Sequence, residues 1–67
     1  MELKRYTVVT EHPALGYATF GFKSSSLDNA ISVARGRADG ADWSRLYEEG
    51  DDEHPVWTKF HIYREEA

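Results

Sequence analysis

The hydrophobic period of this chain changes twice, and this limits the folds that it can adopt. Residues 3–10 (LKRYTVVT) are rich in β-branched side chains, and residues 16–23 (GYATFGFK) alternate in a two-residue pattern, so both segments are typical of β-strands. Residues 24–40 repeat their apolar positions at helical spacing instead. Residues 43–49 and 56–64 are again strand-like. The predicted order is strand, strand, helix, strand, strand.

The tripeptide Glu-His-Pro occurs at both predicted hairpins, as residues 11–13 and 53–55. In the first copy, Pro13 restricts the residue before it to extended backbone, and Gly16 can take the positive φ that closes a hairpin. In the second copy, Pro55 lacks an N–H and suits the start of a strand. Turn chemistry therefore explains both copies, and we expect them at opposite ends of the sheet.

The predicted helix has a recognisable start, stop and buried face. Ser25, followed three residues later by Asp28, has the form of a capping box, and Gly40 is a plausible stop. One face collects mostly small apolar residues: Leu27, Ala30, Ile31, Ala34 and Ala38. Such a face lets a helix lie close to a sheet.

Two hairpins around one helix predict an α+β fold, a β-β-α-β-β antiparallel four-stranded sheet with one helix packed on one face. The chain has 67 residues and no cysteine, so residues 1–67 form a single domain that packing alone must stabilise. We expect a cytoplasmic protein without a membrane partner, because no segment resembles a signal peptide or a spanning helix of about 20 apolar residues.

The sequence predicts no catalytic, cofactor or metal site. It has neither a glycine-rich phosphate loop nor a Gly-x-Ser-x-Gly motif, and no thiolate. His12, His54 and His61 lack the spacing of zinc ligands. Carboxylates in a hydrophilic loop also lack the desolvation that tunes a catalytic acid.

The chain has a net charge of −4, and its acidic residues are concentrated in two segments. Seven of the twelve acidic residues lie in one loop or in the C-terminal tail, so the remainder has eight basic residues against five acidic ones. The loop residues form one candidate contact with a partner: Glu48, Glu49, Asp51, Asp52 and Glu53.

A second candidate contact is the sheet face that the helix leaves uncovered. Alternation predicts that Phe20, Phe22, Leu46, Phe60 and Ile62 pack under the helix. The uncovered face then presents Tyr17, Trp43, Arg45, Tyr47, Trp57, Lys59, His61 and Tyr63, an aromatic and basic surface larger than solvent-facing decoration. Of these, all but Tyr17 are candidate partner-binding residues. Three alternatives are that the aromatic residues pair across strands for stability, that the core is split between both faces of the sheet, or that the face forms a homodimer.

The residue types on this face favour binding over catalysis. Trp, Tyr and Arg dominate protein–protein hot spots, and the same residues on an open sheet hold single-stranded nucleic acid. The acidic loop would repel a phosphate backbone, so a protein partner is preferred and a nucleic-acid partner is the alternative.

The layout "YTVVT…YATFGFKSSSLDNAISVARGRA…SRLYEEG…VWTKFHIYR" resembles that of small phage and mobile-element proteins that include several anti-CRISPR inhibitors. The resemblance implies a stoichiometric inhibitor in the host cytoplasm that binds a CRISPR effector complex and blocks DNA access or the nuclease. It covers the architecture and assigns no residue. Another small regulatory or accessory protein fits the same layout.

Overall fold

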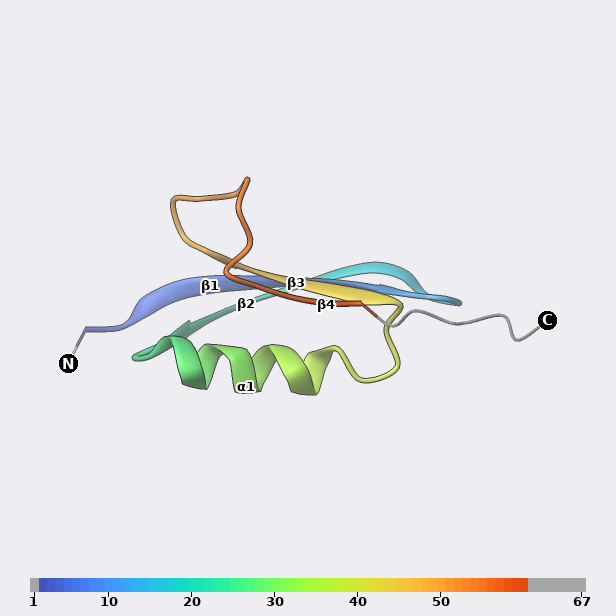
Figure 1. Ribbon diagram of the computed structural model, residues 1–67, viewed down its shortest axis with the longest axis horizontal. Coiled ribbons are helices and arrows are strands. Elements are labelled where there is room, and N and C mark those ends of the chain that lie inside the picture. The colour runs from blue at the N-terminus through green and yellow to red at the C-terminus, as the bar shows by residue number, and fades with distance from the viewer. Residues whose placement is uncertain (1, 61–67) are drawn as a thin grey trace.

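The computed structural model describes residues 2–60 and has two layers, a four-stranded antiparallel sheet and one helix on one of its faces (Figure 1). The predicted α+β class and element order are confirmed. The elements are β1 (Lys4–His12), β2 (Gly16–Ser24), α1 (Leu27–Arg37), β3 (Trp43–Glu48) and β4 (Trp57–Phe60). No helix in residues 2–60 has the length and apolarity needed to cross a membrane.

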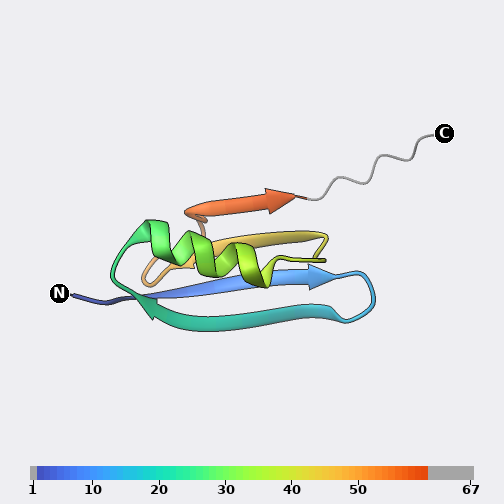
Figure 2. The same ribbon diagram turned by 90° about the horizontal axis from the view of Figure 1, so that it is seen from below.

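The strand order β2-β1-β3-β4 places the first strand inside the sheet. β1 pairs antiparallel with both β2 and β3, so these two neighbours run parallel to each other. Helix α1 makes the connection between them and passes over the middle of the sheet (Figure 2). β2 therefore forms one edge of the sheet and β4 the other.

The turn between β1 and β2 forms as its sequence predicts. His12 pairs with Gly16, and Gly16 has a φ of +83°, which only glycine adopts without strain. The hairpin between β3 and β4 turns at the opposite end of the sheet (Figure 2). The six steps along β1 from Tyr6, which pairs with Glu48, to His12 span about 20 Å. The two Glu-His-Pro segments are thus far apart.

The helix begins one residue later than the capping-box pattern indicates, because Ser26 is the N-cap. Its backbone is extended, and its Oγ accepts a hydrogen bond of 3.1 Å from the backbone N of Asn29. Ser24 supports this start, since its Oγ accepts a 2.9 Å bond from Nδ2 of Asn29 and donates a 2.9 Å bond to the Ser26 carbonyl. The buried Ser24 thus fixes which serine caps the helix.

The core lies between α1 and the central strands. It consists of Tyr6, Val8, Ala30, Ala34 and Leu46, with Phe22, Ile31 and Trp57 packed against it. Two alanines let the helix approach the sheet closely, as predicted. Leu27 is 43% exposed, so this first helical residue stays outside the core.

Strand β4 has the opposite phase from the predicted one. Trp57 pairs with Leu46, so both side chains lie on the helix-covered face, and Lys59 follows on that face opposite Ser44. Phe60 pairs with Trp43 on the other face and is 58% exposed. A one-residue shift in register moves every side chain of a strand to the other face. The shift lets the indole of Trp57 pack against the core.

Candidate functional site

We call the sheet face opposite α1 the open face, and one row of its side chains crosses all four strands. Cross-strand pairing aligns Tyr17, Glu11, Trp43 and Phe60. The Nε1 of Trp43 donates a 2.5 Å hydrogen bond to Oε1 of Glu11, and the Tyr17 ring meets the indole edge-on at 5.8 Å. The indole is therefore held in place in the free protein. We call Tyr17, Trp43 and Phe60 the aromatic row.

Along β3, Arg45 and Tyr47 lie on the open face beside Trp43. The sequence had predicted this face for all three side chains. The Arg45 guanidinium carbon lies 4.7 Å from the centre of the Trp43 ring, within the range of a cation–π contact. All three side chains are half-buried by their neighbours. β3 therefore presents an ordered strip of aromatic and cationic groups.

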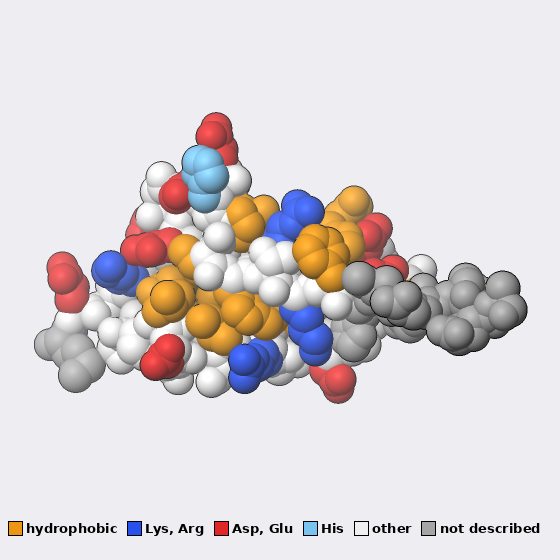
Figure 3. All heavy atoms as spheres, viewed as in Figure 1, with side chains coloured by type: hydrophobic (Ala, Val, Ile, Leu, Met, Phe, Trp, Pro, Cys, Tyr) orange, Lys and Arg blue, Asp and Glu red, His pale blue; other side chains and the backbone are white. Residues whose placement is uncertain are grey.

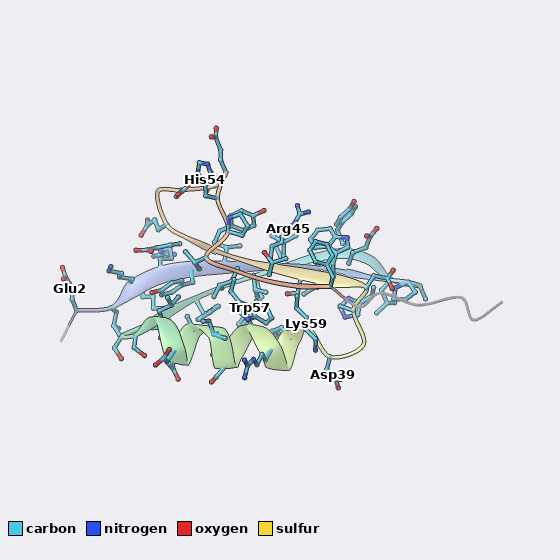
Figure 4. The ribbon with its side chains drawn as sticks, in the orientation of Figure 1. Glu2, Asp39, Arg45, His54, Trp57 and Lys59 are labelled. Atoms are coloured by element: carbon cyan, nitrogen blue, oxygen red, sulfur yellow. The ribbon has the colours of Figure 1, made fainter. Side chains whose placement is uncertain are left out.

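Two predicted members of this surface point the other way. Trp57 and Lys59 extend toward α1, whereas Arg45 extends away from it (Figure 4). Their assignment to the uncovered face was wrong, for the reason of register given above. His61 and Tyr63 lie outside the described residues. The aromatic groups that take part instead include Phe60, which the predicted phase had placed in the core.

The acidic loop projects from the sheet on the open-face side (Figure 1). Carboxylates and an imidazole gather on this projection (Figure 3). Glu48 differs from the other predicted loop residues, because it belongs to β3, pairs with Tyr6 on the helix-covered face, and forms a 3.2 Å ion pair with Lys4. The carboxylates left for a contact above the open face are those of Glu49, Asp51, Asp52 and Glu53, which we call the acidic loop from here on.

A groove joins the acidic loop to the open face. It has a volume of about 320 Å³ and is lined by Thr7, Val9, Tyr47 and Asp52. Tyr47 and Asp52 come from the two surfaces that the sequence predicts as separate contacts. Thr7 and Val9 were missed, because small β-branched side chains on an inner strand carry no sequence signal for binding.

The basic groups on the open face differ from those that the sequence indicates. Among residues 2–60, Arg5 and Lys23 pair with each other across β1 and β2, and Arg45 lies on β3. The acidic loop starts beside Arg5 and Lys23, since the backbone N of Glu49 donates a 2.9 Å hydrogen bond to the Arg5 carbonyl. Positive charge on this face is thus adjacent to negative charge.

A second groove of about 310 Å³ lies on the helix-covered face near the end of α1. Its lining includes Val8, Thr10, His12 and Ala18, and the Arg37 guanidinium carbon lies 3.6 Å from the centre of the Phe20 ring at its border. No sequence pattern pointed to it. In residues 2–60, no three His, Asp or Glu side chains are grouped so that they could hold a metal ion.

The loop geometry predicts a pH-dependent turn centred on Asp51. Its Oδ1 accepts hydrogen bonds from the backbone N of Glu53 (3.3 Å) and His54 (3.1 Å) and lies 3.2 Å from His54 Nδ1. Desolvation, the largest single influence, raises the Asp51 pKa, but the hydrogen bonds from His54 and Glu53 together outweigh it, so the pKa is lowered from its ordinary value of 3.8. A lowered carboxyl pKa stabilises the turn above that ordinary value.

We therefore expect the turn to be intact at neutral pH and lost as the pH falls below about 4 through the lowered Asp51 pKa. Amide chemical shifts of Glu53 and His54, followed by NMR from pH 6 to pH 2, measure this. Asp51→Asn should abolish the transition, and Asp52→Asn should leave it. A midpoint at or above the ordinary carboxyl pKa would contradict the proposed hydrogen bonding.

Comparisons with family models, curated proteins and solved structures found no match to this chain.

Proposed function

We propose that this chain is a non-enzymatic protein-binding module that docks a basic segment of its partner on the open face, between the aromatic row and the acidic loop. One observation carries the proposal, the groove that Tyr47 and Asp52 share. It combines an aromatic wall with a carboxylate, which suits the aliphatic stem and charged head of a lysine or arginine.

The aromatic row supplies the apolar part of the proposed contact. Trp43 is held by Glu11, Tyr17 and Arg45, so it loses little conformational freedom when a partner covers it. Tyr17 is 71% exposed, which leaves its ring area to be buried in a complex. Ordered aromatic side chains of this kind are typical hot-spot residues.

The charge distribution supports a basic partner. Four carboxylates gather on a projecting loop, and the whole chain carries a net charge of −4. Opposite charges speed association and set orientation. Among basic surfaces, the nucleic-acid channel of an effector complex matches best, because such channels are lined by positive charge. We therefore propose a stoichiometric inhibitor of a nucleic-acid-handling machine, with a CRISPR effector complex as the partner class.

Single-stranded nucleic acid is the second candidate. The observation that favours it is Arg45 stacked on Trp43, since a base can stack on such a platform while the cation meets a phosphate. The acidic loop beside Arg5 and Lys23 opposes it.

The test is capture of a partner from nuclease-treated and untreated bacterial lysate, identification of the partner by mass spectrometry, and titration with the purified partner. Trp43→Ala should weaken binding about 30-fold or more, as expected for a hot spot of about 2 kcal/mol. Asp52→Lys should weaken it less and reduce its salt dependence. Leu15→Ala, in a turn residue that is 83% exposed, is the matched control and should bind normally.

The outcomes separate the two candidates. A complex that survives nuclease and is lost with Trp43→Ala supports the protein-binding module, and a CRISPR effector subunit within it supports the inhibitor proposal. Capture that disappears with nuclease favours the nucleic-acid alternative. Unchanged affinity of a folded Trp43→Ala variant would exclude the open face as the contact.

A further inference from the structure

The edge strand β2 has an unusually uniform free border. It is nine residues long, its residues Gly16 to Ser24 pair one to one with β1, and its other side has no neighbour among the described strands. It contains a single charge, Lys23, and no proline. Natural edge strands are usually shortened, bulged, covered or charged to prevent pairing with another chain. β2 has almost none of these protections.

Nothing in the described part of the molecule obstructs this border. Helix α1 lies over the middle of the sheet and leaves the outer side of β2 uncovered (Figure 2). The acidic loop joins β3 to β4, at the edge of the sheet opposite β2. Side chains of β2 are exposed on both faces, Tyr17 on the open face and Phe20 on the helix-covered face. A strand that approached β2 would therefore meet the backbone and side chains of β2, among them Phe20, whose ring is covered by the Arg37 guanidinium on the helix-covered face.

We propose that β2 pairs antiparallel with β2 of a second copy of this chain, about a two-fold axis that lies midway between the two copies of Phe20. The pairing would join the two sheets into one continuous sheet of eight strands. Phe20 would meet the partner's Phe20, Thr19 would meet the partner's Gly21, and Tyr17 would meet the partner's Lys23. This inference concerns the free border of β2, and Tyr17 is the one residue that it shares with the aromatic row of the proposed function.

The register follows from strand geometry and charge. In an antiparallel ladder, alternate residues turn both their N–H and their C=O groups to the same neighbour. Only residues of the same parity can then face each other across the new ladder, so at the axis one residue must face its own copy. An axis at Phe20, the midpoint of Gly16–Ser24, is the choice that pairs all nine residues.

This register also makes the two copies complementary. It places each Lys23 ammonium opposite the partner's Tyr17 ring, a favourable cross-strand pair, and keeps the two lysines apart. The two-fold axis is normal to the sheet, so both helices lie on one side and both open faces on the other. The dimer would present two open faces side by side.

The cysteine-free chain permits a direct test by crosslinking. Paired residues across an antiparallel ladder have Cα atoms about 4.5–5.5 Å apart, within the range that a disulfide spans. Phe20→Cys should form a disulfide-linked dimer under mild oxidation, far faster than Ser32→Cys on the exposed side of α1. Thr19→Cys and Gly21→Cys should crosslink when mixed and only slowly alone. A β-carbon at Gly21 meets nothing closer than 3.9 Å, so that variant should fold.

A charge swap tests the same register without cysteine. Tyr17→Lys would face the partner's Lys23 twice per dimer, and we expect sedimentation velocity to show at least a tenfold weaker dimer. Adding Lys23→Glu should restore it. Within one chain, position 17 faces Glu11 and position 23 faces Arg5, so the double variant creates no like-charge pair there.

Three results would overturn the proposal. The first is a wild-type mass that stays at the monomer value of 7.7 kDa up to about millimolar concentration. The second is crosslinking of Phe20→Cys no faster than that of Ser32→Cys. The third is a dimer that Tyr17→Lys leaves intact. All three results measure self-association of the chain, so they test the dimer whether or not a partner binds to the open face.

Discussion

Replacing Leu46 with alanine is expected to leave most of the protein unfolded at 25 °C. The Leu46 side chain is fully buried at the centre of the core, where it packs with Val8, Ala30 and Ala34. Leucine-to-alanine changes in cores cost about 2–5 kcal/mol, and a domain of this size rarely has more than about 3–5 kcal/mol of stability. Urea unfolding followed by circular dichroism measures the loss.

Leu15→Ala provides the matched control for this change. It removes the same atoms from a side chain that is 83% exposed, so the free energy of unfolding should change by less than about 0.5 kcal/mol. A Leu46→Ala protein as stable as the control would show that the core lies elsewhere.

Trp57→Ala is expected to reduce stability and to leave partner affinity unchanged. Trp57 lies on the helix-covered face opposite Leu46 and packs against the core. Full burial of a tryptophan would make this truncation cost about 3–5 kcal/mol, and because Trp57 is only half-buried we expect about 1–3 kcal/mol. The midpoint of urea unfolding, together with titration of the partner at low temperature where the variant is folded, gives the two readings.

Trp43→Ala is the natural comparison, because it removes the same ring from the opposite face. It should lose partner affinity and less stability than Trp57→Ala. If Trp57→Ala keeps the wild-type free energy of unfolding but loses the partner, then Trp57 belongs to the contact surface after all, and the register of β4 is wrong.

The element order was predictable because each element carries its own local signal. The hairpin at Gly16 and the small apolar face of α1 depend on residues close together in the sequence. The outward positions of Trp43, Arg45 and Tyr47 followed from alternation, since Leu46 between them is the clear apolar residue of β3. Strong local signals therefore set both the fold class and this part of the site.

The phase of β4 could not be predicted for a physical reason. Large apolar residues occupy both parities of its sequence, as Val56, Trp57 and Phe60 show, so alternation alone allows either face. The choice is made by pairing with β3: the backbone N of Val56 donates a 2.7 Å bond to the Leu46 carbonyl, and Trp57 lies opposite Leu46. A non-local contact thus decides which side chains belong to the open face.

The groove likewise depends on geometry between distant segments. Thr7 and Val9 reach it from β1, and Asp52 reaches it from the loop. The same holds for the ion pair between Lys4 and Glu48, because these two residues are far apart in the sequence. Sequence spacing carries no information about such contacts.

The chain has two tryptophans, and the sheet separates them, with Trp43 on the open face and Trp57 beneath the helix. Intrinsic fluorescence therefore comes from two spectroscopically distinct environments. In a Trp57→Phe protein the remaining indole emits from the proposed contact surface, and in a Trp43→Phe protein it emits from beside the core. The molecule thus carries one built-in optical reporter for surface events and one for the packed interior, without any added label.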